Sequence, residues 1–162
     1  MKSLKQMVSE NFYYSNGDLF NKKNRGAHAK ANQVAGHATS KGYRRVEMLG
    51  KSYYAHRLIW VLCNGQLKDS EFIDHINGLK TDNRVENLRV VDKAGNNQNL
   101  REPKVNNQSG FLGVYQNKKT LRFEAQIRAN GEKTHIGTFD SAESANSAYL
   151  LAKRQLHKTC SV

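Results

Sequence analysis

The stretch that decides the fold is residues 72–99, which read FIDHINGLKTDNRVENLRVVDKAGNNQN. Apolar residues form the end of a short strand at Phe72-Ile73, a polar loop follows over residues 77–87, and residues 88–91 form a second strand. Asp92 is a candidate N-cap for the short helix that comes next. The stretch predicts a strand–loop–strand–helix unit, in which a strand end and a helix face come together.

Polar side chains stand at both of those places. Asp74 and His75 lie where the first strand meets the loop, and Asn96 lies on the helix. Carboxylate and amide oxygens are hard ligands suited to Mg²⁺, which takes only one or two protein ligands. An imidazole titrates near neutral pH and suits a general base. We expect one divalent ion at Asp74 and Asn96, with Asn97 and Asn99 as alternatives for the second ligand, and His75 as the base.

The charge of the chain is unevenly distributed. The net charge is +12, and residues 1–67 carry 11 Lys and Arg against 3 Asp and Glu. Residues 68–100 carry 5 against 6, and residues 101–162 carry 10 against 5. Basic surfaces gain affinity for polyanions by releasing counterions from phosphates. The basic flanks therefore predict a nucleic-acid partner, and the slightly acidic centre is consistent with a bound cation.

Several other classes of site do not fit the composition. Cys63 and Cys160 stand alone and far apart, so we expect neither a disulfide framework nor a structural zinc site. Cys63 lies in an apolar run, which predicts a small buried residue. No run approaches the ~18 apolar residues of a membrane span. We expect a monomeric, cytoplasmic protein without a membrane partner.

The region N-terminal to the central stretch is expected to be β-rich. Two short strands surround Asn16-Gly17, a second hairpin covers residues 42–54 and turns at Gly50-Lys51, and residues 22–41 form a mobile loop. A short apolar helix then ends at Asn64-Gly65.

The region after the central stretch predicts three antiparallel strands and one helix. A polar linker with Pro103 leads to strands at residues 113–115, 123–128 and 134–139, followed by a helix from residue 141 to about 157. The fold class is α+β in four parts: residues 1–67, a β-rich region with a short helix; residues 68–101, the strand–loop–strand–helix unit; residues 102–108, the linker; and residues 109–162, a three-stranded antiparallel sheet packed on one helix.

Five short motifs between residues 10 and 100 occur in an order and spacing that resemble the HNH endonucleases of phages, including homing endonucleases. These motifs are His56-Arg57-Leu58-Ile59-Trp60, Ile73-Asp74-His75-Ile76-Asn77-Gly78, Thr81-Asp82-Asn83-Arg84, Asn87-Leu88-Arg89 and Asn96-Asn97-Gln98-Asn99. The resemblance implies that the central stretch is a ββα-metal unit. A phage gene would place the protein in the host cell cytoplasm.

The same resemblance implies a role for each motif residue. Asp74 and Asn96 would hold one divalent ion, Mg²⁺ or Mn²⁺, His75 would be the general base, and Asn87 would hold the loop that orients His75. The last position of the family motif is often histidine, and the asparagine here keeps an oxygen ligand. The implied reaction is phosphodiester hydrolysis that leaves 5′-phosphate and 3′-hydroxyl ends, as a nick or a double-strand break.

The C-terminal region resembles the plant ethylene-response-factor (Apetala-type, AP2/ERF) DNA-binding domain over residues 107–158. The resemblance rests on Ser109-Gly110-Phe111-Leu112-Gly113-Val114, Phe123-Glu124-Ala125-Gln126-Ile127, Ile136-Gly137-Thr138-Phe139 and Ala142-Glu143-Ser144-Ala145-Asn146-Ser147-Ala148-Tyr149. It implies a sheet in the major groove of DNA. The DNA-facing residues would be Tyr115, Asn117, Lys119, Arg122, Gln126, Arg128, Lys133 and His135. Leu112 replaces a family arginine, and Phe123 or His135 replaces a strand tryptophan, so base preference does not transfer.

These features predict a metal-dependent endonuclease that cuts double-stranded DNA. Two alternatives stay open. The first is a sequence-specific DNA-binding regulator that keeps the fold without catalysis. The second is a nuclease acting on RNA, which fits less well because the major groove of A-form RNA is too narrow for a sheet to read.

Overall fold

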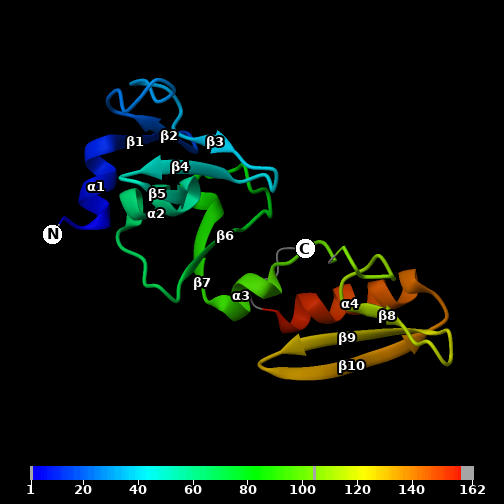
Figure 1. Cartoon of the computed structure of the whole chain (residues 1–162). Coiled ribbons are helices and arrows are strands. Elements are labelled where there is room, and N and C mark those ends of the chain that lie inside the picture. Colours follow the sequence, from blue (N-terminus) through cyan, green and yellow to red (C-terminus); the bar gives the residue numbers. More distant parts are fainter. Residues whose placement is uncertain (1, 104, 158–162) are drawn as a thin grey trace. The chain divides into compact units, whose positions relative to one another are not determined.

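The computed structural model describes residues 2–103 and 105–157. The chain forms two compact units, Met1–Lys93 and Ala94–Val162, and each combines strands and helices (Figure 1). This confirms the predicted α+β class. The finer division into four parts stays a prediction.

The N-terminal unit begins with a helix, a hairpin and a small antiparallel sheet, followed by a second helix. In chain order these are α1 (Leu4–Asn11), β1 (Phe12–Ser15), β2 (Asp18–Asn21), β3 (His37–Ala38), β4 (Arg44–Met48), β5 (Lys51–Tyr54) and α2 (Ala55–Asn64). Strands β1 and β2 pair with each other, and β4 lies between β3 and β5. A single core joins them, and Phe12, Leu19, Val46, Leu58 and Ile59 are fully buried in it.

Four details of this unit differ from the sequence-based expectations. The second hairpin turns at Leu49 and Gly50, which both have positive φ, whereas Lys51 already belongs to β5. Such turns match the right-handed twist of the paired strands. Strand β3 lies inside the predicted loop and forms by pairing with β4. Helix α1 was not predicted, although Ser3 forms a capping box with Gln6. Cys63 is exposed rather than buried.

The central stretch forms the predicted succession of strand, loop, strand and helix. Strand β6 (Phe72–His75) pairs antiparallel with β7 (Leu88–Val91), and the single-turn 3₁₀ helix η1 (Val85–Asn87) ends the connecting loop. Helix α3 (Lys93–Gln98) follows, and the boundary between the two compact units falls at its first residue. Ile73 and Leu88 join the N-terminal core, which fixes the two strands to the rest of that unit.

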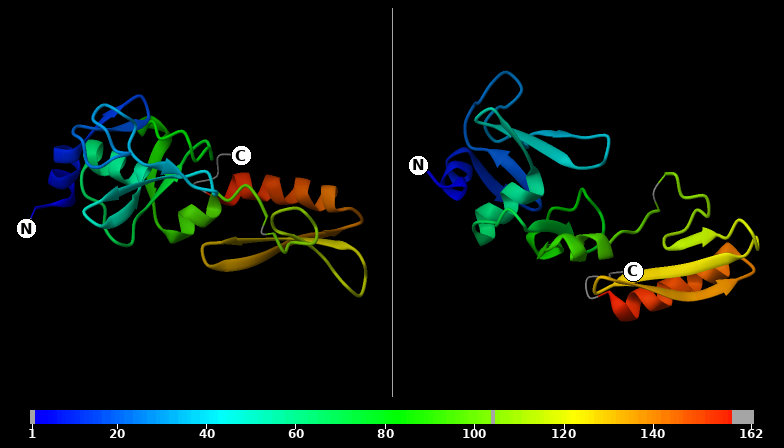
Figure 2. Two further views of the ribbon diagram at one scale, coloured as in Figure 1. Left: turned by 45° about the horizontal axis from the view of Figure 1, so that its top comes forward. Right: turned by 60° about the horizontal axis from the view of Figure 1, so that its bottom comes forward.

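The C-terminal unit is a three-stranded antiparallel sheet with one helix along one face (Figures 1 and 2). Its elements are β8 (Val114–Gln116), β9 (Phe123–Ala129), β10 (Glu132–Phe139) and α4 (Ala142–Leu156). Asn130 and Gly131 form the turn between β9 and β10, and the expected helix begins one residue later than predicted because Ser141 is its N-cap. Gly113 has φ +68, and a Cβ there would lie 2.1 Å from the Tyr149 ring, so only glycine lets this helix side chain pack against the chain.

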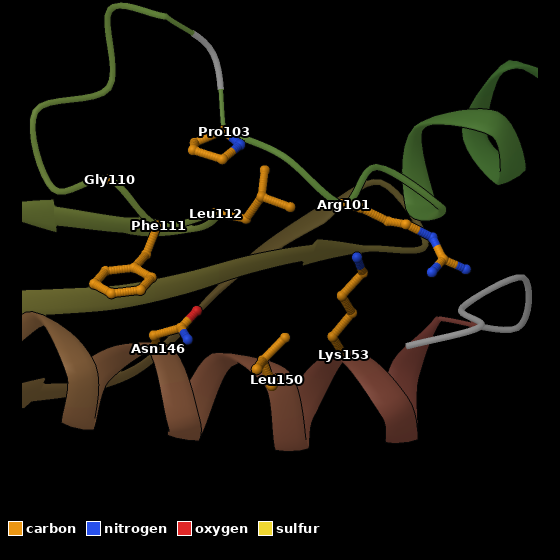
Figure 3. A pocket seen from close by; sticks show the side chains of 8 residues that line it. All are labelled: Arg101, Pro103, Gly110, Phe111, Leu112, Asn146, Leu150 and Lys153. Atoms are coloured by element: carbon orange, nitrogen blue, oxygen red, sulfur yellow. The ribbon is translucent and has the colours of Figure 1, made fainter. Parts of the chain in front are cut away.

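A small hollow lies in the C-terminal unit between α4 and the segment that leads into β8 (Figure 3). Its volume is about 180 Å³, and Lys153, whose ammonium donates a hydrogen bond to the carbonyl of Leu100, lies at one end. The lining residues are Arg101, Pro103, Gly110, Phe111, Leu112, Asn146, Leu150 and Lys153. The buried lysine thus ties Leu100 to the helix.

Candidate functional site

Strand β6 brings Asp74 and His75 to its C-terminal end. In the antiparallel register Asp74 faces Arg89 and His75 faces Leu88. Successive side chains of a strand point to opposite sides, so the carboxylate and the imidazole leave β6 in opposite directions.

His75 is buried and held by a partner from the loop that follows it. Its Nε2 lies 2.9 Å from Oδ1 of Asn83, and both residues are only 4% exposed. An amide oxygen only accepts hydrogen bonds, so this contact requires the Nε2–H of His75 as the donor. The orientation of the imidazole is therefore set by Asn83, eight residues further along the chain.

Aromatic rings from distant segments surround His75. The ring of His56 meets it edge-on, with centroids 5.0 Å apart, and Tyr43 lies 6.2 Å away. Tyr54 stacks on His56 at 5.4 Å, and Tyr43 contacts both Tyr54 and His56. Tyr43, Tyr54, His56 and His75 form one cluster, which we call the aromatic cluster.

His56 is the electrostatically unusual member of this cluster. The pKa of His56 falls to about 3, mainly because the ring is buried, and the neighbouring His75 and Arg57 contribute in the same direction. His56 is therefore neutral at ordinary pH. A neutral ring packs against His75 without the repulsion that a second imidazolium would bring.

Asn87 ties together the two ends of the loop between the strands. Its Oδ1 accepts from the backbone N–H of Asn77, and its Nδ2 donates to Oδ1 of Asn77 and to the carbonyl of Asp82. Buried polar groups satisfied in this way rigidify a loop. These bonds are consistent with the expected orienting role, because the loop they hold carries Asn83.

A second set of contacts fixes the outer part of the same loop. The guanidinium of Arg84 donates two hydrogen bonds to the carboxylate of Asp82, and the side-chain amide of Asn77 donates another. The bond from Arg84 is the main reason that the pKa of the Asp82 carboxyl lies well below its usual range. This part of the loop is thus held by its own side chains.

The proposed metal ligand Asp74 is engaged in an ion pair. Both Nε and Nη2 of Arg89 donate to the same carboxylate oxygen, Oδ2, at 2.9 and 2.8 Å. A cation at this carboxylate would use Oδ1 or displace Arg89. One carboxylate oxygen and one amide oxygen suit Mg²⁺, which completes its shell with water and phosphate.

Asn96, Asn97 and Asn99 follow the second strand but belong to the other compact unit. Asn96 and Asn97 lie on α3, and Asn99 comes directly after it and is buried. Within the described part of the chain, no group of three or more His, Cys, Asp or Glu side chains is placed to hold a metal ion. The assignment of Asn96 therefore rests on its place in the motif.

The open face of the C-terminal sheet gathers five of the eight residues expected to face DNA. In the register of the strands Lys133 pairs with Arg128, and His135 pairs with Gln126. Tyr115 pairs with Glu124, two positions along the same face. Ala125 and Ile127 alternate with these residues and are buried toward α4. The face opposite the helix is thus polar and carries several basic groups.

The other three expected residues lie at the edge of this face, in or next to the turn between β8 and β9. Asn117 caps that turn by accepting from the backbone N–H groups of Lys119 and Thr120. Arg122 forms an exposed ion pair with Asp140. The side chains of Asn117 and Arg122 therefore have local structural partners.

Glu124 organises the centre of the open face and was not among the expected residues. It accepts hydrogen bonds from the Tyr115 hydroxyl and the Asn117 amide, and Gln126 donates to the same hydroxyl. The bond from Tyr115 lowers the pKa of the Glu124 carboxyl, while burial and this acid raise the pKa of Tyr115 to about 12. An ionised carboxylate thus lies among the basic side chains.

Sequence reasoning missed Asn83, Tyr43 and Tyr54, and it placed His56 in one of the five motifs without a catalytic role. Asn83 belongs to one of the five motifs but was assigned no role. Its position eight residues after His75, on the same loop, could have indicated a contact between the two side chains. The tyrosines carried no signal, because their contacts depend on how β4, β5 and α2 pack.

Comparisons with known proteins bear on the same part of the chain. Residues 53–98 match the HNH endonuclease family model. The matched segment contains Asp74, His75, Asn83, Asn87 and Asn96. The chain is also 28% identical to Protein 3.8 of Escherichia phage T7 over 102 residues, which are 63% of this chain and 83% of that protein. No solved structure gave a significant match.

The family match supports a nuclease domain, and the similarity to Protein 3.8 supports a relationship to a phage protein. The family match ends at residue 98 and leaves the C-terminal sheet unassigned. No described helix has the length and apolar character of a membrane span.

Proposed function

We propose that this protein is a metal-dependent endonuclease that hydrolyses phosphodiester bonds in double-stranded DNA. The observation that carries the proposal is the buried His75, oriented by Asn83 on a loop that Asn87 holds, within the residues that match the HNH family. An enzyme that uses an imidazole as a base needs this kind of fixed orientation.

In the proposed reaction His75 takes a proton from a water molecule, which attacks the phosphorus in line with the leaving 3′ oxygen. Asn83 holds the Nε2 side of the ring, so the ring keeps one orientation toward the water. Asp74 and Asn96 would supply the oxygen ligands of a divalent ion. Such an ion supplies positive charge that stabilises the transition state.

The C-terminal sheet is proposed as the element that engages the target. Its open face is wide, polar and partly basic, and a β-structure of this size enters the major groove of DNA. Tyr115, Gln126, Arg128, Lys133 and His135 would face the DNA. Glu124, at the centre, would accept hydrogen bonds from bases rather than approach phosphates.

A regulator that binds DNA without cutting it is the second candidate. Two observations favour it: His75 is only 4% exposed, and Asp74 already has the cation Arg89 as its partner. Cleavage would require water to reach His75 and a metal ion to compete with Arg89. The next experiment separates the two candidates.

Incubation of the full chain with supercoiled plasmid and Mg²⁺ is expected to give nicked or linear DNA, and EDTA is expected to abolish the products. The ends should carry 5′-phosphate, which a ligation assay detects. A gel-shift measurement in EDTA reports binding separately. Binding without cleavage in Mg²⁺ or Mn²⁺ would establish the regulator, and cleavage that survives EDTA would overturn the metal requirement.

Removing positive charge from the open sheet face should weaken DNA binding. We expect Arg128→Gln and Lys133→Gln each to lower the slope of log affinity against log salt by about 0.9, the value for one phosphate contact on duplex DNA. The matched control is Arg154→Gln, on the helix that covers the opposite face. Equal losses in all three variants would show that the sheet face has no special role.

A further inference from the structure

Two cations next to the aromatic cluster are held by tyrosine rings. The Arg45 guanidinium lies 5.5 Å from the centre of the Tyr54 ring, and the Lys80 ammonium lies 5.2 Å from the centre of the Tyr43 ring. Both distances are within the range of cation–π attraction. Arg45 and Lys80 are exposed, so their charged groups face solvent.

The fold explains how these cations reach the cluster from different segments. Val46 and Met48 on β4 are buried, so the alternate residue Arg45 points away from the core, and the register places it beside Tyr54 on β5. Lys80 belongs to the loop after β6, and its aliphatic chain runs along Gly42, next to Tyr43. Strand β4 and the loop after β6 thus each place one cation beside the aromatic cluster.

The tyrosines connect the cations to the candidate base. Tyr43, whose ring contacts the Lys80 ammonium, also contacts His75 directly. The ring of Tyr54 contacts the Arg45 guanidinium and stacks on His56. His56 in turn contacts His75. Only one aromatic ring would separate a phosphate bound by Lys80 from the His75 imidazole, and two rings would separate a phosphate bound by Arg45 from it. This is the arrangement expected for groups that hold a strand on both sides of a reacting phosphodiester.

Three other cations of the same unit are committed to the fold. Arg84 pairs with Asp82 and Arg89 with Asp74, while Arg57 donates to the carbonyl of Glu71. Among the described residues, no carboxylate forms an ion pair with Arg45 or Lys80. Their charge is therefore not neutralised by an acid, and the rings restrict the side chains before a ligand arrives.

We propose that Arg45 and Lys80 bind the phosphates that flank the cleaved phosphodiester of a DNA strand. The inference rests on the proposed endonuclease function, which supplies the reacting phosphate at His75. The aromatic cluster has two roles in this arrangement. It holds the imidazole, and it keeps two long cationic side chains extended toward the DNA backbone, which lowers the entropy lost on binding.

The test measures duplex binding by the full chain in EDTA over a series of salt concentrations. The probe is a fluorescently labelled duplex of arbitrary sequence, because phosphate contacts do not depend on sequence. Arg45→Gln and Lys80→Gln are each expected to lower the salt slope by about 0.9, and the double variant by about twice that value. Affinity at a fixed salt concentration should fall several-fold.

Lys51→Gln is the matched control. Lys51 is equally exposed and lies on the same sheet, at the hairpin end of β5 rather than beside Tyr54. Its loss should change the slope by less than half as much. Unchanged slopes in Arg45→Gln and Lys80→Gln, an equal effect of Lys51→Gln, or no measurable duplex binding by the wild-type protein would each overturn the proposal.

A cleavage assay with the same proteins separates this proposal from the endonuclease function. If the two variants bind less tightly, their KM for plasmid should rise while kcat changes little. A wild-type protein that binds with the expected slopes but cleaves nothing would remove the proposed function and leave the phosphate contacts in place. Cleavage with unaltered slopes and KM would remove the phosphate contacts alone.

Discussion

Replacing His75 with alanine is expected to slow plasmid cleavage by about 10²- to 10⁴-fold, the range for loss of a positioned general base. The affinity for duplex DNA in EDTA should change little, because the imidazole is buried and acts on water rather than on the DNA backbone. Initial rates of supercoiled plasmid loss at saturating protein measure the first quantity, and gel shifts measure the second.

A buried side chain also contributes to stability, so a control for folding is needed. His75→Gln keeps a buried amide that reaches toward Asn83, and Trp60, the only tryptophan, reports unfolding of the N-terminal unit by its fluorescence. If His75→Gln unfolds at the wild-type denaturant concentration and still cuts at the wild-type rate, His75 is not the base.

The second large effect is a loss of folding stability at low pH, caused by the buried His56. Its pKa falls from the ordinary 6.5 to about 3 in the folded protein. Between pH 6.5 and pH 3 the unfolded chain therefore binds a proton at His56 that the folded protein does not bind. Stability is therefore fully present above about pH 6.5 and is lost as the pH falls toward 3. At 1.36 kcal/mol per unit, the loss is on the order of 5 kcal/mol.

His56→Phe keeps a ring against His75 and Tyr54 and removes this titration. We expect its free energy of unfolding, followed by Trp60 fluorescence in urea, to depend much less on pH between 7 and 4 than that of the wild type. His28→Phe removes an exposed histidine of the same unit and should retain the wild-type pH dependence. Parallel curves for wild type and His56→Phe would contradict the buried, neutral state of His56.

Local sequence signals predicted those elements whose cause is local. Asn16-Gly17 and Asn130-Gly131 adopt the positive φ values that two-residue hairpins need, and the predicted C-terminal helix forms within one residue of its expected ends. The strand pair around the central loop was predicted in the same way. The positions of Asp74 and His75 at the end of β6 followed from that prediction.

Elements formed by packing were less visible. Helix α1 has a capping box but only a few apolar residues, and the burial of Val8 against the core of the unit stabilises it. Strand β3 has two residues, His37 and Ala38, with no alternating pattern, so it exists only because β4 offers hydrogen bonds. Cys63 lies in an apolar run, yet it falls on the outer side of α2.

By itself, the sequence determined the order of the central unit and the residue types it offers: a carboxylate, an imidazole, and the asparagine that ties the loop. These follow from short-range spacing, which a strand or loop converts directly into position. Only the tertiary structure decided what surrounds His75. Tyr43, Tyr54 and His56 are about 20 to 30 residues away in the chain, and strand register and helix packing bring their rings together. The same packing places Arg45 beside Tyr54, Lys80 beside Tyr43, and Arg89 in an ion pair with Asp74. The spacing of these residues in the sequence does not predict such contacts.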